Sequence, residues 1–257
     1  MAFAGQLATS LNIYLIIFSF ILSASQESQS FKNLQLSYPR VKSAYDSKEK
    51  VLKKYFDDAG LSYIGFHLFL RVFKKEKTIE AWVKEKRKDD FTLLHTYSFC
   101  ASSGTLGPKR KEGYLQIPEG VYEINHFNPQ SSFYLSLGIN YPNASDRKLG
   151  DPKAPGGSIY IHGNCVTIGC IPITDDKIKE LYLLAVEARN SGQARLPVYI
   201  FPDRLDQDSL DRLTVELSTS RLTKDFWKNL QVVYEDFEKT KKLRDVGVTV
   251  SGMYFLK

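Results

Sequence analysis

The chain has 257 residues, of which 43% are hydrophobic and 25% charged, a globular composition that excludes a wholly disordered protein. Its length is enough for one domain or two small ones. Lys and Arg exceed Asp and Glu by 35 − 29 = 6. These charges are scattered and no basic helix is interleaved with aromatic residues, so no nucleic acid is predicted as a partner.

The first 25 residues carry no charged side chain, and residues 11–22 are mostly apolar. This run is too short to span a bilayer comfortably, but it suits the hydrophobic region of a signal peptide. Ser23, Ala24 and Ser25 supply the small residues of a cleavage site. We therefore expect residues 1–25 to be a signal peptide and the rest of the chain to be exported to the periplasm or cell envelope. An uncleaved N-terminal anchor is the alternative, because no Lys or Arg precedes the run.

Residues 26–42 are polar and predict a linker, and residues 43–59 have the pattern of an amphipathic helix that ends at Gly60. Aromatic and β-branched residues then predict strands over 64–73, 78–84, 91–101, 116–125 and 132–139. The charged residues 74–77 predict a solvated hairpin turn between the first two strands. Residues 140–157 predict a loop, and loops of this length are usually functional or mobile.

A strand is predicted over 158–162 and a second short one over 166–170. Thr174 is expected to cap a helix over 175–190, with Asp175 and Asp176 in its first turn. A strand follows over 196–201. The tail predicts helices near 205–217 and 224–239 and a last strand over 246–255. Six apolar residues repeat at helical spacing in the second helix, and such a stripe usually belongs to a core: Phe226, Trp227, Leu230, Val233, Tyr234 and Phe237.

The segment from Ile159 to Thr174 places one of the four His residues and two of the three Cys residues within nine positions. An imidazole such as that of His162 can remove the proton from a thiol and raise its thiolate fraction. Cys170 also precedes the helix that starts at Thr174, whose positive end would lower the thiol pKa. Gly169 allows a sharp turn and a close approach of substrate to the backbone.

Other interpretations of these residues remain open. His162, Cys165 and Cys170 are the right types to bind zinc, although their spacing is not that of a standard zinc knuckle and no fourth ligand lies nearby. Cys165 and Cys170 could instead form a disulfide, or all three could be inert core residues. Three Cys in an exported chain is an odd number, so at least one thiol is free or paired with another molecule.

The segment resembles the active-site signature of the YkuD-type L,D-transpeptidases, which has His-Gly, then Ser or Thr, a variable residue and Gly-Cys. The short gap between His and Cys resembles the YafK-like branch of that family. Two positions depart from the pattern of the larger family, which has His where this chain has Ile168 and Arg where it has Pro172. The resemblance covers about residues 63–201, and these positions carry it: His162-Gly163, Thr167, Ile168, Gly169-Cys170, the Gly- and Pro-rich run from Ser103 to Lys109, Pro118-Glu119-Gly120, Phe133 to Leu137 and Asn140 to Asn143.

The resemblance implies an α+β fold, in which a mainly β catalytic domain over 61–202 has flanking helices. A linker and N-terminal helix over 26–60 precede it, and a helical C-terminal extension over 203–257 follows. Cys170 would be the nucleophile and His162 its base. The carbonyl of Gly163 would orient the imidazole, and the backbone amides around Gly169 and Cys170 would face the oxyanion. Four residues are expected to contact substrate: Thr167, Ile168, Tyr141 and Lys109.

Three functions follow as hypotheses. A transpeptidase would attack a peptidoglycan stem peptide, release D-alanine and pass the acyl group to an amine, with a wall-linked protein as a further partner. A hydrolase would discharge the same acyl-enzyme to water and cut a wall peptide or a protein–wall linkage. A non-catalytic module would only bind wall peptide, which the presence of both Cys170 and His162 argues against. Neither a cofactor nor a bound metal is expected.

Overall fold

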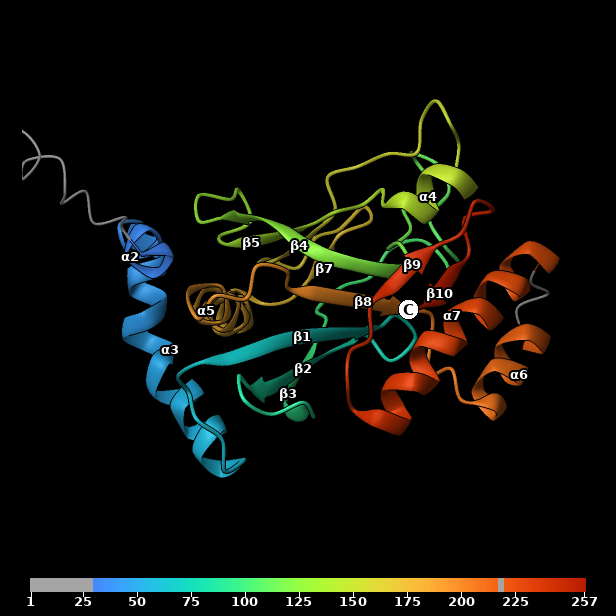
Figure 1. Ribbon diagram of the computed structural model, residues 1–257. Coiled ribbons are helices and arrows are strands. Elements are labelled where there is room, and N and C mark those ends of the chain that lie inside the picture. Colours follow the sequence, from blue (N-terminus) through green and yellow to red (C-terminus); the bar gives the residue numbers. More distant parts are fainter. Residues whose placement is uncertain (1–29, 217–219) are drawn as a thin grey trace, which may run out of the picture. The chain divides into compact units, whose positions relative to one another are not determined.

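An eight-stranded mixed sheet forms the centre of the computed structural model, which describes residues 30–216 and 220–257 (Figure 1). The sheet curls into a half-barrel. Strand β1 pairs with β8 and β6 with β7 in parallel, and all other neighbours are antiparallel. In spatial order the strands are β3 (Thr92–Ser98), β2 (Thr78–Glu85), β1 (Phe66–Phe73), β8 (Pro197–Phe201), β4 (Gly120–Asn128), β5 (Ser136–Ile139), β6 (Tyr160–His162) and β7 (Ile171–Pro172).

Strand β1 is apolar at most positions because both of its faces are covered. Successive side chains of a strand point to opposite faces. Leu68 and Leu70 therefore enter one core, while Phe69 and Phe73 enter a second core on the other face. The first core lies against the N-terminal helices and the second against the C-terminal ones.

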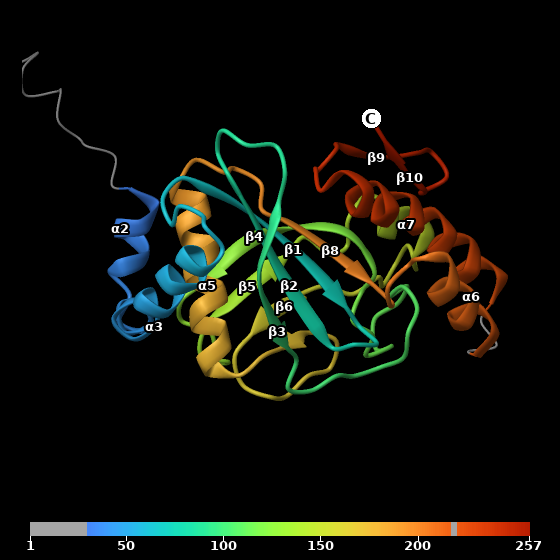
Figure 2. The same ribbon diagram turned by 90° about the horizontal axis from the view of Figure 1, so that it is seen from below.

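Helices cover the sheet from two sides (Figures 1 and 2). Helix α5 (Asp175–Asn190) contacts β1, and α2 (Phe31–Leu36) and α3 (Pro39–Asp58) pack on α5. On the opposite side lie α6 (Gln207–Glu216), α7 (Arg221–Thr240) and a two-stranded hairpin of β9 (Val246–Val248) and β10 (Tyr254–Leu256). The predicted apolar stripe of α7 is confirmed as core, since its six residues are buried.

Several expectations differ from the structure. Residues 31–36 and 39–42 are helical rather than linker, and Gln35 is buried where it accepts a hydrogen bond from Tyr182 of α5. Pro39 can begin α3 because the first helical position needs no amide donor. The predicted loop over 140–157 contains a short helix, α4 (Ala144–Leu149), which Asn143 and Asp146 start with a capping box. Residues 166–170 are not a strand, and β7 begins only at Ile171.

Lys74 is the clearest exception to the solvated turn predicted over 74–77, because its side chain is buried. Its ammonium donates to the carbonyls of Thr105, Gly107 and Ile117, and to Glu119 Oε1 at 2.7 Å. Glu119 is fully buried and also accepts a hydrogen bond from Trp227 Nε1 of α7 at 2.7 Å. The C-terminal helix thus anchors the loop that precedes β4.

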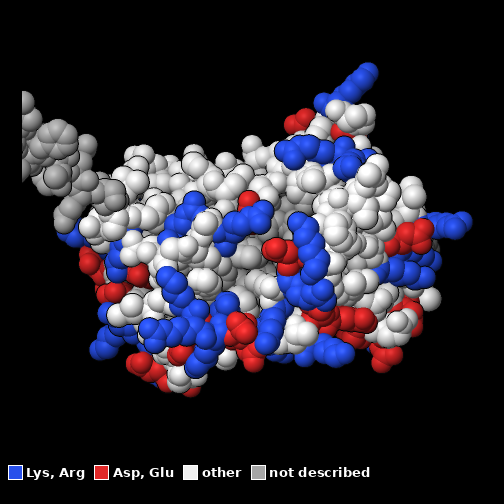
Figure 3. Space-filling view, in the orientation of Figure 1, with Lys and Arg blue, Asp and Glu red and all other residues white. Residues whose placement is uncertain are grey.

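The surface agrees with the scattered charge of the sequence. On the face shown in Figure 3, basic and acidic side chains are interspersed. The predicted signal peptide lies outside the described residues. Within residues 30–216 and 220–257, no helix is long and apolar enough to cross a membrane.

Candidate active site

A cavity of about 560 Å³ contains both His162 and Cys170. Its walls come from the end of β4 and the turn after it, from strands β5 and β6, and from the loop that follows His162. The lining is largely apolar and includes the exposed side chains of Val166 and Ile168, together with several hydroxyl-bearing residues. Its lining residues include Asn128, Ser131, Ser132, Phe133, Ser136, Ser158, Tyr160, Val166, Thr167 and Ile168.

Cys170 is the free cysteine of the chain and lies immediately before β7. Its Sγ is 3.6 Å from the carbonyl oxygen of Ser158 and can donate to it. Burial raises the pKa of the Cys170 thiol, while the Tyr160 amide and the Lys109 ammonium act in the opposite direction. The positive end of α5 was expected to lower this pKa, whereas the net shift is upward.

His162 is 1% exposed and is held by its own neighbour in sequence. Its Nδ1 lies 2.5 Å from the carbonyl oxygen of Gly163, as predicted. Because a carbonyl can only accept, Nδ1 carries the hydrogen and Nε2 of the neutral ring is left as the acceptor. Phe133 stacks on the imidazole with ring centroids 4.6 Å apart. Burial lowers the pKa of His162, and the bond to Gly163 partly opposes this, so the net shift favours the neutral ring.

Thr167 shapes the turn that carries the nucleophile. Its Oγ1 donates to the carbonyl of Cys170 at 2.8 Å and accepts from the amide of Gly169 at 3.1 Å. The Gly169 amide is therefore engaged, which corrects the expectation that it faces an oxyanion. Within the described residues, no hydrogen-bond acceptor is seen for the amide of Cys170 itself. Gly169 has φ +133°, and a Cβ there would lie 3.2 Å from the carbonyl oxygen of Gln116, so a glycine is required at this position.

Of the other three residues predicted to contact substrate, one lines the cavity and two do not. Ile168 is 78% exposed and lines the cavity. Tyr141 is buried, and its hydroxyl lies within hydrogen-bonding distance of the carbonyls of Pro155 and Lys109, so it joins two loops. Lys109 is buried, and its positive charge acts to lower the pKa of the Cys170 thiol. Burial lowers the pKa of Lys109, while Glu112 and Cys170 oppose this.

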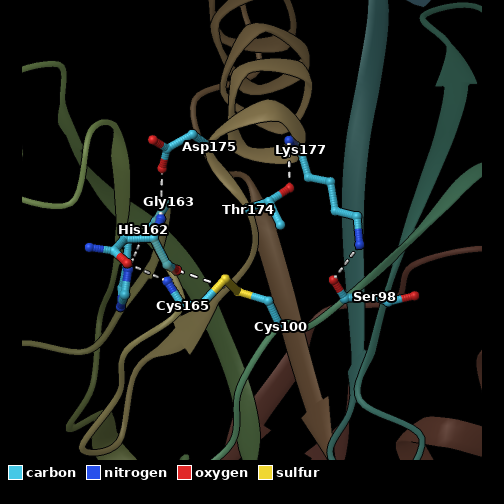
Figure 4. The surroundings of a disulfide bond; sticks show 9 residues. Ser98, Cys100, His162, Gly163, Cys165, Thr174, Asp175 and Lys177 are labelled. Atoms are coloured by element: carbon cyan, nitrogen blue, oxygen red, sulfur yellow. Dashed lines mark hydrogen bonds between the residues drawn. A yellow bond between two sulfur atoms is a disulfide. The ribbon is translucent and has the colours of Figure 1, made fainter.

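A disulfide between Cys100 and Cys165 ties the segment after β3 to the loop between His162 and Cys170 (Figure 4). It excludes a Cys165–Cys170 disulfide and removes Cys165 as a thiolate ligand for zinc. Cys100 was not singled out from the sequence. The number of cysteines could have predicted this disulfide, because assigning Cys170 as the free nucleophile leaves only Cys100 and Cys165 to pair.

No group of three or more His, Cys, Asp or Glu side chains suited to hold a metal ion occurs in the part of the chain that the structure describes. Three further site residues were also missed by sequence reasoning. Phe133 stacks on the base, Ser158 faces the thiol, and Asp175 contacts the peptide after Gly163. Phe133 belongs to a stretch that carries the family resemblance, and Asp175 is a charged residue directly after the predicted cap, but neither pattern indicated these contacts.

Comparisons with known proteins identify the family of the domain that holds this cavity. Residues 69–200 match the sequence profile of the L,D-transpeptidase catalytic domain, YkuD. The chain is 35% identical over 193 residues to the YafK protein of Escherichia coli strain K12, which carries a provisional L,D-transpeptidase assignment. The match covers 74% of each chain. YafK of Escherichia coli O157:H7 matches equally.

Two solved structures are also similar. The helical cell shape determining protein Pgp2 of Campylobacter jejuni has a TM-score of 0.43 and 16% identity, over 77% of this chain and 80% of that chain. L,D-transpeptidase 1 of Mycobacterium tuberculosis has a TM-score of 0.27 and 15% identity, over 52% of this chain and 62% of that chain.

Proposed function

The chain belongs to the YkuD family of L,D-transpeptidase catalytic domains, and from this membership we propose that it transfers acyl groups of peptidoglycan stem peptides through a thioester on Cys170. One observation carries the proposal. The free thiol and a buried imidazole, whose Nδ1 is fixed by a backbone carbonyl, line the same cavity. This arrangement leaves Nε2 of His162 as the base.

In the proposed first step, Nε2 of His162 takes the proton from Cys170 Sγ as the sulfur attacks the carbonyl carbon of diaminopimelate. The amide bond to D-alanine then breaks, and the leaving amine takes the proton back from the imidazolium. Burial raises the pKa of the thiol and lowers that of the imidazole. Both shifts favour the neutral pair in the free protein, so proton transfer accompanies attack rather than preceding it.

The negative charge that develops on the carbonyl oxygen needs donors. The amide of Cys170 is the proposed donor, because the Gly169 amide is already bound to Thr167. Lys109 is the cation whose charge reaches Cys170. It is proposed to stabilise the anionic states of the reaction and to meet the carboxylate of the substrate, as Pro172 provides no charge where the larger family has Arg.

Resolution by water is the second candidate outcome. Pro172 removes the Arg that the larger family places two residues after the nucleophile, and its carbonyl is used in a hydrogen bond from the Cys100 amide. If the acyl-enzyme binds an amine-bearing acceptor more weakly, water competes better for the acyl group. This would favour hydrolysis of a wall peptide or of a protein–wall linkage. The acyl-enzyme is the same in both reactions.

Action outside the cytoplasm, in the periplasm or cell envelope, is part of the proposal. The Cys100–Cys165 disulfide supports it, because such bonds persist in oxidising compartments and are rare in the cytosol. The uncharged N-terminal segment supports it independently.

The purified protein, incubated with tetrapeptide muropeptides with and without an added amine acceptor, tests the function. Mass spectrometry should show release of D-alanine, and the second product reveals whether amine or water accepts the acyl group. Cys170→Ala should release none. Equal release by wild type and Cys170→Ala would overturn the proposal.

A further inference from the structure

One peptide group connects the base to a carboxylate on helix α5. The amide of Asn164 donates to Asp175 Oδ1 at 2.7 Å. The carbonyl of Gly163 accepts from His162 Nδ1. These two groups belong to the same peptide unit, in which the N–H and the C=O point in opposite directions. Asp175 and His162 therefore bind the two ends of one planar group.

Two groups approach the Cα of Gly163 too closely for a side chain to fit there. A Cβ at Gly163 would lie 2.5 Å from Asp175 Oδ1 and 2.8 Å from the carbonyl oxygen of Phe133. Any side chain would therefore push away the carboxylate or the segment whose ring stacks on His162. The glycine of the His-Gly pair thus makes room for Asp175.

Local structure holds the peptide in this orientation. Asn164 has φ 63°, in the left-handed region that Asn tolerates better than most residues. Its side-chain Oδ1 accepts from the amide of Cys165 at 2.6 Å, and Cys165 is fixed by its disulfide to Cys100. On the other side, Asp175 stands on a helix whose apolar residues fill the main core.

Capping of the helix does not require Asp175. The N-cap is Thr174, whose hydroxyl accepts from the amide of Lys177. The neighbouring Asp176 shares the first turn and forms an ion pair with Lys48. Asp175 differs from it in binding the loop that carries the base.

We propose that Asp175 is a positioning residue that fixes and polarises the Gly163–Asn164 peptide, and thereby orients His162 and strengthens it as the base of the proposed acyl transfer. A carboxylate on the N–H end of a peptide makes its carbonyl oxygen a better acceptor, because hydrogen-bonded groups polarise one another. The arrangement parallels a Ser-His-Asp triad with a peptide inserted between carboxylate and imidazole. Asp175 is exposed, so solvent screens its charge and the effect is smaller than that of a buried carboxylate.

Asp175→Asn tests the charge alone, because the amide oxygen can still accept from Asn164. Asp175→Ala removes the acceptor as well. Asp176→Asn is the matched control, since it removes one negative charge from the same helical turn. Circular dichroism and thermal melting of all three variants establish that the fold is kept.

The first readout is the pKa of His162, followed by NMR and assigned by the signal that His162→Gln lacks. A nearby anion favours the imidazolium. Asp175→Asn should therefore lower the His162 pKa by a few tenths of a unit more than Asp176→Asn does. Equal His162 pKa values in the two variants would overturn the proposal. This readout does not depend on turnover, so it decides the role of Asp175 even if the muropeptide assay fails and the proposed function falls.

The second readout is the kinetics of D-alanine release. We expect kcat to fall about tenfold in Asp175→Asn with KM little changed, the low end of what partners behind a functional His contribute. In the pH profile of kcat/KM for Asp175→Asn, the fall on the acid side should shift to lower pH, in step with the lower pKa of His162. Asp175→Ala should lose more kcat than Asp175→Asn, because the Asn164 amide then lacks a partner. A fall in kcat without movement of the acid limb would show a merely structural role and contradict the proposal.

Discussion

Cys100 is bonded to both sides of the turn that carries the nucleophile. Its Sγ forms the disulfide with Cys165, and its amide donates to the carbonyl of Pro172 at 3.0 Å. Cys170 lies between these two attachment points. Cys100, which follows β3, therefore holds the turn that carries the thiol against the sheet. Cys100 itself does not line the cavity.

Replacing both Cys100 and Cys165 by Ala should destabilise the protein by about 2–5 kcal/mol, since the bond closes a long loop in the unfolded chain. The two residues are 65 positions apart. Turnover should fall without vanishing, because Thr167 still holds Cys170. Urea unfolding measures the first effect and D-alanine release the second. An unchanged unfolding free energy would show that the disulfide is absent from the folded protein.

Alkylation of Cys170 by iodoacetamide should follow the shifted pKa of the thiol. Burial raises this pKa above its ordinary value of 9.0, so the thiolate fraction at pH 7 is lower than that of an exposed cysteine. The rate should therefore be slow at neutral pH and rise to half its maximum only above pH 9.0. Peptide mass mapping across pH gives the profile. A midpoint below the ordinary value would instead indicate a preformed thiolate–imidazolium pair.

Lys109→Met should move that alkylation midpoint further upward, by up to about one unit, because it removes the positive charge that stabilises the thiolate. Lys111→Met is the control in the same loop, as Lys111 is exposed and faces Asp151. The same alkylation profile, recorded for both variants, measures the difference. Identical shifts in the two would mean that Lys109 has no specific effect on Cys170.

Glu119→Ala should destabilise the protein by about 3–5 kcal/mol, because it leaves the buried ammonium of Lys74 without its counter-charge. Trp227→Phe should cost less, about 1–3 kcal/mol, since it removes one donor to Glu119 and part of a buried ring but leaves the Lys74–Glu119 ion pair in place. Glu112→Ala on the exposed part of the loop should change stability by less than about 0.5 kcal/mol. Urea unfolding of the three variants tests this order, and a Glu119→Ala protein as stable as Glu112→Ala would refute it.

Periodic patterns in the sequence predicted the sheet and helices well. The run of aromatic and β-branched residues that predicted β1 and the apolar stripe of α7 are both found in the cores. The cap at Thr174 was also found where its sequence predicted it. Such features depend on neighbours in the chain, which a sequence displays directly.

Long-range pairing explains what sequence reasoning missed. Lys74 was predicted to be solvated because its neighbours are charged, but its burial depends on Glu119, which follows 45 residues later. The disulfide depends on which two distant thiols meet. The Gly169 amide was expected to be free, and its bond to Thr167 depends on the conformation of the turn. The bond from His162 to Gly163, in contrast, joins adjacent residues and was predicted.

Intact-protein mass spectrometry after brief incubation with a tetrapeptide muropeptide tests most directly whether Cys170 and His162 act as nucleophile and base. We expect an adduct with the mass of the muropeptide less D-alanine, mapped to Cys170 and absent from Cys170→Ala. Its formation should be about 100-fold slower or more in His162→Ala, the contribution expected of a general base. An adduct on another residue, or one that forms at the wild-type rate in His162→Ala, would contradict the proposed pair.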